Sequence, residues 1–211
     1  GIEEQTLKPK AVVMVFDGDV PQILLDIVFK YKPRIENFII IQKRWSGLPD
    51  SLNLGSSYVQ TKWFARCDTD DKPSVNFIEF FDEKVSRSRP DVAVISGSVV
   101  KDYGSFSVIC GNREKNITKH NLMMRAKNLL FHPAVCVKKE IFDRLGGYPS
   151  GRMEDFRLWT SILSSGYTIS LYADVIAILA SSNQTKRRVG FDYFIAELSF
   201  FFKKFRSAPY Y

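Results

Sequence analysis

The sequence predicts an α/β fold with a mostly parallel central sheet flanked by helices. Short apolar runs that are typical of buried strands alternate with longer amphipathic segments that are typical of helices. Turn-forming or acidic residues follow several of the apolar runs, at the positions where strands of an open sheet end. With 211 residues, of which 45% are hydrophobic, the chain is long enough for one α/β domain, or a domain and a tail, with a sizeable core.

The amino-terminal half begins with an apolar, β-branched run at 11–16, which predicts a buried strand. Pro21 favours a helix over 21–31, because proline is well tolerated in the first helical turn. The other elements expected in this half are a strand at 38–41, a helix at 50–60, a strand at 63–67, a helix at 74–88 and a strand at 92–100.

In the carboxyl-terminal half, Gly146-Gly147 follows a short helical segment and is a good signal for its end. The elements expected here are a helix at 119–127, a β-like run at 131–137, helices at 139–145 and 154–164, strands at 169–171 and 175–180, and a Phe-rich helix from about 190. Right-handed crossovers would place the carboxyl ends of the strands on one rim. We therefore expect Asp17 and the acidic residues 68–71 to share that rim.

The segment 63–73 carries the strongest chemical signal. It begins as a buried strand and ends in three carboxylates within four residues. Asp68 and Asp70 would point to the same side of an extended chain, and two close carboxylates repel unless a cation lies between them. A hard divalent ion such as Mg²⁺ or Mn²⁺ suits these oxygen ligands. The alternative is an acidic turn that caps the following helix, a role that we expect for Asp71 in either case.

Charge and cysteine content narrow the functional class. The net charge of +7 favours phosphorylated ligands or anionic membrane surfaces, and nucleic acid is not expected, because no recognised binding motif accompanies the charge. Cys67, Cys110 and Cys136 are scattered, so neither a disulfide framework nor a zinc site is indicated. No secretory signal is visible and no apolar run reaches the ~18 residues of a spanning helix. Isolated cysteines in strands are typical of a reducing compartment, so a cytoplasmic location is expected, with contact at the inner face of the plasma membrane as an option.

Six motifs follow one another along nearly the whole chain: Asp17-Gly18, Asn53-Leu54-Gly55, the segment from Ala65 to Asp71, Phe131-His132-Pro133, Gly146-Gly147-Tyr148 and the segment from Glu154 to Trp159. The ordered series resembles the family 2 glycosyltransferases with the GT-A fold. It is most similar to the bacterial branch that builds O-antigen, capsule or exopolysaccharide repeat units. The run at 186–193 resembles the basic segment that follows the catalytic domain in that branch.

This resemblance implies a division into a GT-A catalytic domain at 1–180 and a basic, aromatic helical tail at 181–211. The family begins with a strand and a helix ahead of the point where this sequence begins. We therefore expect a further, central strand between the strands at 11–16 and 63–67.

The resemblance also implies a donor site for a nucleotide-diphosphate sugar, with a UDP-hexose as the expected donor. Asp68 and Asp70 would form the DxD element that holds Mn²⁺ or Mg²⁺, and Arg66, Asn53 and Asp17 would contact the donor. Asp17 has a simpler alternative, because an Asp-Gly pair is a common turn. Arg44 and Trp45 are equally consistent with a donor contact and with a solvated loop.

Asp155 is the expected general base, which would take the proton of the acceptor hydroxyl in a single inverting displacement. The alternative is that Glu154 and Asp155 only favour the positive end of a helix dipole. His132, Glu154 and Trp159 are candidate contacts to acceptor or phosphate. A hydrogen-bonded core histidine and a core tryptophan are the competing interpretations.

Lys186, Arg187 and Arg188 could bind a diphosphate or anionic lipid headgroups, or their helix could pack back on the domain. The expected acceptor is a saccharide or a lipid-linked glycan. Two other functions are considered: a non-catalytic basic module that binds nucleic acid or anionic membrane, and a metal-dependent nucleotidyltransferase. The second is weakened by the lack of a Gly-rich phosphate loop with lysine.

Overall fold

The computed structural model describes residues 1–111, 114–118 and 130–180. The helices expected at 119–127 and beyond 190 lie outside these residues, as do Lys186, Arg187 and Arg188. The division of the chain at residue 180 stays a prediction.

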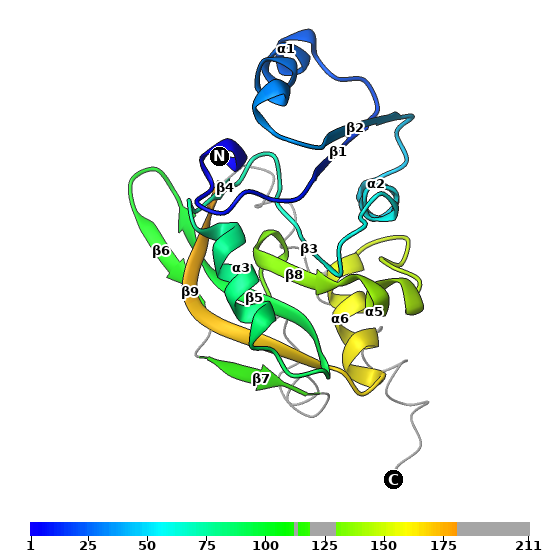
Figure 1. Ribbon diagram of the computed structural model, residues 1–211, viewed down its shortest axis with the longest axis vertical. Helices are drawn as coiled ribbons and strands as arrows, with labels where there is room; N and C mark the ends of the chain where they lie inside the picture. Colours follow the sequence, from blue (N-terminus) through cyan, green and yellow to red (C-terminus); the bar gives the residue numbers. More distant parts are fainter. Residues whose placement is uncertain (112–113, 119–129, 181–211) are drawn as a thin grey trace.

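The strands form two separate sheets (Figure 1). The smaller sheet pairs β1 (Val12–Asp17) with β2 (Phe38–Lys43) in parallel. The larger sheet has the order β3-β8-β5-β9-β4, with β6 paired to β5 and β7 to β9. Its strands are β3 (Trp63–Ala65), β4 (Lys72–Pro73), β5 (Val92–Asp102), β6 (Ser107–Cys110), β7 (Lys115–Ile117), β8 (Val135–Lys138) and β9 (Thr168–Ala180).

The prediction of a mostly parallel sheet is wrong for the larger sheet. Only β5 and β9 run parallel there, whereas β8 runs antiparallel to both β3 and β5, and the β4–β9, β5–β6 and β7–β9 pairs are antiparallel too. The prediction treated each strand as part of a strand–helix–strand unit, which requires parallel neighbours. Instead, the chain re-enters the sheet with Val135 beside Ser96 and then runs back along β5.

This reversal determines where the functional residues lie. Because β8 is antiparallel to β3, its first residues meet the carboxyl end of β3, with Cys136 opposite Ala65. The residues just before β8, including His132, therefore lie near the acidic residues that follow β3.

The helices agree with the expected segments to within a few residues. They are α1 (Gln22–Tyr31), α2 (Leu48–Ser57), α3 (Phe77–Ser86), α5 (Lys139–Arg144) and α6 (Glu154–Ser164), with short 3-10 turns η1 (Ile2–Glu4), η2 (Lys32–Arg34) and η3 (His132–Ala134). The strands expected at 169–171 and 175–180 are one strand, β9, because its pairing with β5 continues across two irregularities in register near Ser98.

Two hydrophobic clusters cover the two faces of the larger sheet. On β5, Val94 belongs to the cluster that includes Phe142 of α5 and Trp159 of α6, and its neighbour Ile95 belongs to the cluster that includes Phe77 of α3. This alternation is the period of two that a strand buried on both faces requires. Helices therefore hold both faces of the sheet that carries the acidic loop.

The smaller sheet is less enclosed, since every residue of β1 is only half-buried. Among the described residues, β1 pairs only with β2 and β3 only with β8. The further strand expected between β1 and β3 stays a prediction. None of the described helices has the length and apolar character needed to cross a membrane.

Candidate functional site

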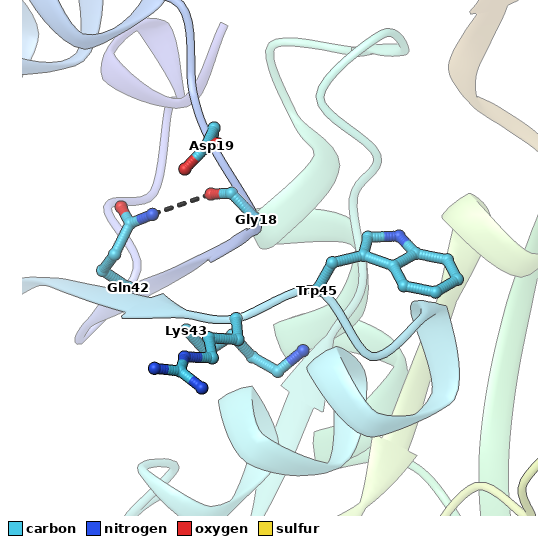
Figure 2. A pocket seen from close by; sticks show the side chains of 6 residues that line it. Gly18, Asp19, Gln42, Lys43 and Trp45 are labelled. Atoms are coloured by element: carbon cyan, nitrogen blue, oxygen red, sulfur yellow. Dashed lines mark hydrogen bonds between the residues drawn. The ribbon is translucent and has the colours of Figure 1, made fainter.

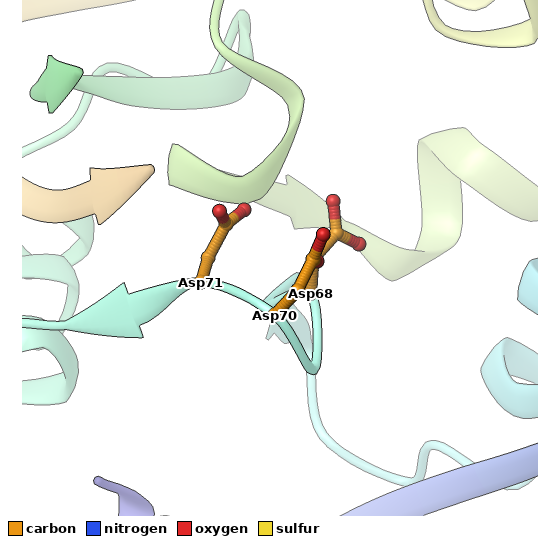
Figure 3. A group of neighbouring side chains, drawn as sticks. All are labelled: Asp68, Asp70 and Asp71. Atoms are coloured by element: carbon orange, nitrogen blue, oxygen red, sulfur yellow. The ribbon is translucent and has the colours of Figure 1, made fainter. Parts of the chain in front are cut away.

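Three carboxylates gather on the loop between β3 and β4. One oxygen from each of Asp68, Asp70 and Asp71 lies within 4.8 Å of the others, and all three side chains extend from the same side of the loop (Figure 3). A turn in which the Asp71 N–H donates to the Asp68 carbonyl, at 3.2 Å, brings them together. An oxygen-only set of this kind fits a hard divalent cation.

Asp71 does not cap the following helix, so that expectation was wrong. Helix α3 begins at Phe77 with Asn76 at its N-cap position, five residues beyond Asp71. The short strand β4 intervenes, and it leaves Asp71 with the acidic loop rather than with the helix.

Arg66 binds the Asp68 carboxylate of this loop. Its side chain is only 7% exposed, and its guanidinium group contacts both oxygens of Asp68, with Nη1 2.9 Å from Oδ2. The backbone N–H of Arg66 donates to Val135 of β8 at 3.0 Å, which fixes the start of the loop. Paired contacts of this kind restrict the orientation of a carboxylate. Within the described residues, Arg66 is thus a support for Asp68.

The side-chain amide of Asn53, on α2, makes two hydrogen bonds to the backbone of Tyr148. Its Nδ2 donates to the Tyr148 carbonyl and its Oδ1 accepts from the Tyr148 N–H, both at 2.8 Å. The preceding Gly147 has φ +73°, and a Cβ there would lie 2.5 Å from Asn53 Oδ1. The Gly146-Gly147-Tyr148 motif is therefore a turn built to meet this amide.

The Tyr148 side chain leads into a buried cluster. Tyr148 is 2% exposed, and its hydroxyl lies 2.9 Å from His132 Nε2. The other ring nitrogen of His132, Nδ1, lies 3.9 Å from Glu154 Oε1, and these two side chains are 10% and 15% exposed. Burial, with a contribution from the positive charge of Arg66, places the pKa of His132 well below its usual value. His132 is thus neutral at pH 7.

Tyr148 also connects the acidic loop with the first turn of α6. Burial raises the pKa of its hydroxyl; Arg66 opposes this rise, and Asp155, Glu154 and Asp68 add to it. Carboxylates from two segments more than eighty residues apart therefore act on one buried hydroxyl. Asp155 lies in the first turn of α6, where its Oδ1 accepts from the Phe156 N–H at 2.7 Å.

Trp159 is fully buried in the core cluster, packed edge-on to the His132 ring with 6.0 Å between ring centroids. Of the two interpretations left open by the sequence, this burial favours a core tryptophan, and contact with an acceptor stays a prediction. Its position four residues after Asp155 sets the face of α6 that packs on the sheet.

A second group of residues lies at the carboxyl ends of β1 and β2. Burial favours the neutral form of Asp17, but hydrogen bonds from Lys43, from the backbone N–H groups of Ser46 and Gly47 and from Ser51 outweigh it and lower the pKa of Asp17 to about 2. The two backbone groups bind one Asp17 oxygen each at 2.9 Å. Asp17 thus anchors the loop after β2 rather than forming a free Asp-Gly turn.

The loop that Asp17 anchors borders a hollow of about 590 Å³ lined by Gly18, Asp19, Gln42, Lys43, Arg44 and Trp45. Two of these lining residues are bonded to each other, since Gln42 Nε2 donates to the Gly18 carbonyl at 2.7 Å (Figure 2). The Trp45 ring is 77% exposed, so it offers a free aromatic face. A flat, partly polar ligand with an anionic group suits this lining.

Sequence reasoning missed two residues of these groups. Lys43 lies just beyond the strand expected at 38–41 and was given no role, although a lysine after a buried strand could have been paired with an acidic turn such as that at Asp17. Tyr148 was noted only as part of a glycine motif, and its aromatic ring in an otherwise flexible turn was the available signal.

Comparisons with known proteins agree on one family. Residues 1–137 match the family model described as "Glycosyl transferase family 2". The amylovoran biosynthesis glycosyltransferase AmsE of Erwinia amylovora is 28% identical over 95% of this chain and 76% of its own length. An Escherichia coli protein named UDP-Gal:alpha-D-GlcNAc-diphosphoundecaprenol beta-1,3-galactosyltransferase is 27% identical over 93% of this chain and 72% of its own.

Solved structures share the fold at low identity. Staphylococcus aureus TarS 1-349 in complex with UDP-GlcNAc has a TM-score of 0.73 at 14% identity, covering 99% of this chain and 62% of that one. The mannosyltransferase PcManGT of Pyrobaculum calidifontis, in complex with GDP-Man and Mn²⁺, has a TM-score of 0.70 at 17% identity, covering 99% and 59%. The chain thus spans about three fifths of the length of these structures.

Proposed function

The chain belongs to glycosyltransferase family 2, and we propose that it transfers a hexose from a nucleotide-diphosphate sugar to a hydroxyl of a saccharide or lipid-linked glycan. The observation that carries the proposal is the acidic loop, where one oxygen from each of Asp68, Asp70 and Asp71 lies within 4.8 Å of the others. Asp155 of α6 lies close enough to this region that both Asp155 and Asp68 raise the pKa of the buried Tyr148 hydroxyl. The two groups would have different tasks.

The acidic loop would hold Mn²⁺ or Mg²⁺. Its three carboxylates supply oxygen ligands at suitable mutual distances, and Asp68 is already oriented by Arg66. We assign the direct ligand role to Asp70, and to Asp68 a shared or ribose contact. When bound, such an ion neutralises charge on the leaving diphosphate.

Asp155 would act as the general base. The acceptor oxygen forms a bond to the anomeric carbon while the bond from that carbon to the diphosphate oxygen breaks. The acceptor proton passes to Asp155, and the diphosphate leaves with the electron pair. One displacement with one base inverts the configuration at the anomeric carbon. General-base catalysis of this kind contributes about 10²- to 10⁴-fold to the rate.

The hollow beside Asp17 would receive part of the nucleotide. Its exposed Trp45 ring could stack on a base, and Arg44 and Lys43 line the same space. We infer a uridine donor because the E. coli relative is named for UDP-Gal and TarS is solved with UDP-GlcNAc. A guanosine donor is the alternative that PcManGT represents.

The acceptor would be a lipid-linked glycan at the inner face of the plasma membrane, in the synthesis of a bacterial surface polysaccharide. The names of both curated relatives support this, one through amylovoran and the other through a diphosphoundecaprenol acceptor. Lys186, Arg187 and Arg188 would then contact the diphosphate or the lipid headgroups.

A transfer assay tests the proposal. The full-length protein is incubated with Mn²⁺, α-D-GlcNAc-diphosphoundecaprenol and a panel of UDP- and GDP-hexoses, and release of nucleoside diphosphate and the lipid-linked product are measured. We expect Asp155→Asn to lower turnover by about 10³-fold. Asp143→Asn is the matched control, because Asp143 is an exposed residue paired with Lys139 on α5, and it should leave turnover unchanged. A wild-type rate in Asp155→Asn, or equal losses in both variants, would overturn the proposed role of Asp155.

A further inference from the structure

We propose that His132, Tyr148 and Glu154 form a buried positioning cluster that holds the first turn of α6, and with it Asp155, in its orientation toward the acidic loop. This inference rests on the proposed function of Asp155. It assigns to His132 a role distinct from the substrate contact expected from the sequence, since His132 acts through Glu154 and the backbone rather than on a ligand.

Three side chains surround the ring of His132: Tyr148, Glu154 and Trp159. Nε2 lies 2.9 Å from the Tyr148 hydroxyl and Nδ1 lies 3.9 Å from Glu154 Oε1. The ring faces contact Tyr148 and Trp159, with ring centroids 5.2 and 6.0 Å away. Nε2 is thus within hydrogen-bond distance of Tyr148, whereas Nδ1 is beyond hydrogen-bond distance from Glu154 and interacts with it electrostatically. Only 10% of the His132 side chain is exposed, so little of the ring is accessible to a substrate.

The surroundings select one tautomer of His132. A neutral imidazole carries one N–H and one acceptor nitrogen. Burial disfavours ionisation of Tyr148, so its hydroxyl remains a proton donor. If Tyr148 donates to Nε2, the ring N–H lies on Nδ1 and faces the Glu154 carboxylate, which is attractive. The opposite tautomer would direct the Nδ1 lone pair at that carboxylate, which is repulsive, so the geometry favours Nδ1–H.

The backbone conformation of Met153 shows why the first turn of α6 needs support. Met153, the residue before Glu154, is buried at 4% exposure and adopts a left-handed conformation with φ 61° and ψ 36°. This conformation is strained for a residue with a Cβ and persists only where the surroundings enforce it. Loss of the attraction on Glu154 would let this junction relax and move Asp155 with it.

The Tyr148 end of the cluster is bound to helix α2. Asn53 on α2 binds the backbone N–H and carbonyl of Tyr148 at 2.8 Å. These bonds fix the backbone from which the Tyr148 side chain extends to His132. The cluster therefore connects α2, the turn before β8 and α6. A shift at Asp155 of about 1 Å could cost on the order of 10²-fold in rate.

The first test is spectroscopic and needs no substrate. The chain has two histidines, His120 and His132, so ¹⁵N-histidine labelling of the full-length protein, with His120→Gln for assignment, isolates the His132 ring. Long-range ¹H–¹⁵N spectra should show a neutral Nδ1–H tautomer at pH 7. Tyr148→Phe or Glu154→Gln should shift the tautomer balance toward Nε2–H. A ring that is Nε2–H in the wild type, or that is unaffected by both variants, overturns the proposal.

The second test measures positioning. Tyr148→Phe and His132→Phe should each lower kcat by about tenfold or more, with KM for the donor within about twofold, and His132→Asn, which retains a donor near Nδ1, should recover part of the loss. Tyr167→Phe is the matched control: it also removes a hydrogen-bonded tyrosine hydroxyl, which accepts from Arg144 at 2.6 Å, but on an exposed part of the fold. Unchanged kcat in Tyr148→Phe and His132→Phe, or an equal loss in Tyr167→Phe, contradicts the inference.

The two proposals fail separately. If Asp155→Asn retains full turnover, the proposed function of Asp155 is wrong whatever the tautomer of His132. If Asp155→Asn is inactive while Tyr148→Phe and His132→Phe are fully active, the proposed base stands and the positioning cluster is wrong.

Discussion

The turn before α6 offers a stability test in which two adjacent glycines serve as variant and control. Gly146 and Gly147 both have positive φ, 81° and 73°, so an alanine at either position pays a backbone cost of about 1 kcal/mol. Only at Gly147 would the new Cβ also meet packed atoms, 2.5 Å from Asn53 Oδ1 and 3.2 Å from Phe142 Cε1, whereas nothing lies within 4 Å at Gly146.

The difference between the two sites follows from overpacking. Inserting a carbon into a filled space costs about 1–3 kcal/mol, so we expect Gly147→Ala to lose about 3 kcal/mol of unfolding free energy and Gly146→Ala about 1. Asn53→Ala removes two hydrogen bonds to Tyr148 and leaves both of its backbone groups without that partner, at a cost of about 2–4 kcal/mol.

The double variant separates strain from contact. In Asn53→Ala/Gly147→Ala the Oδ1 atom is gone, so the combined loss should fall short of the sum by about 1–2 kcal/mol. Urea unfolding of the full-length variants, followed by circular dichroism, measures each free energy, with an unchanged m-value as the check on two-state behaviour. Equal losses at the two glycines, or a strictly additive double variant, would refute the assignment of Asn53 as the clamp on Tyr148.

Three other predictions concern ionisation. Hydrogen bonds from Lys43 and the loop after β2 lower the pKa of Asp17 to about 2. The ionised carboxylate therefore stabilises the fold at pH values above its unfolded pKa near 4, and this contribution of about 1 kcal/mol, discounted for solvent, is lost as the pH falls from 4 to 2. The unfolding free energies of the wild type and Asp17→Asn should converge in that window. The lowered pKa of His132 means that the folded protein excludes a proton that the unfolded chain binds near pH 6.5. Stability should therefore fall as the pH drops below about 6.5, and His132→Gln should flatten that dependence, as measured by urea unfolding at a series of pH values. Burial, with a smaller contribution from the charges of Asp68 and Asp71, raises the pKa of Cys67 to about 12. Alkylation of Cys67 by N-ethylmaleimide at pH 7.5, measured by mass spectrometry, should therefore be slow in the folded protein and fast in urea. Equal rates would contradict the buried environment.

The sequence was sufficient for most of the local structure. Alternating apolar runs and amphipathic segments located β1, β2, β5 and all five described α-helices, because each element has a period that its burial requires. The direction of β8 could not be predicted in the same way. It depends on the path of the chain between β5 and Val135, and the hydrophobic periodicity of a strand does not show whether it runs parallel or antiparallel to its neighbours.

The acidic loop was predicted from spacing, since two aspartates two residues apart after a buried strand can share a cation. The inclusion of Asp71 in this group of carboxylates was not predicted. It depends on the position of β4 and on the start of α3 at Phe77, and β4 is held by its long-range pairing with β9. The roles of Asn53, His132 and Trp159 also depend on contacts with residues distant in the chain. Their burial among those contacts is invisible in the sequence, which is why a positioning role and a ligand role could not be separated there.

Calorimetric titration of UDP into the full-length protein, with and without Mn²⁺, tests the central claim most directly. We expect Mn²⁺-dependent binding that Asp70→Asn weakens by about tenfold or more, while Asp155→Asn binds within about threefold of the wild type and yet fails to turn over. If Asp70→Asn binds UDP with unchanged Mn²⁺ dependence, or if Asp155→Asn loses binding and Asp70→Asn does not, the division of labour between the acidic loop and α6 is wrong.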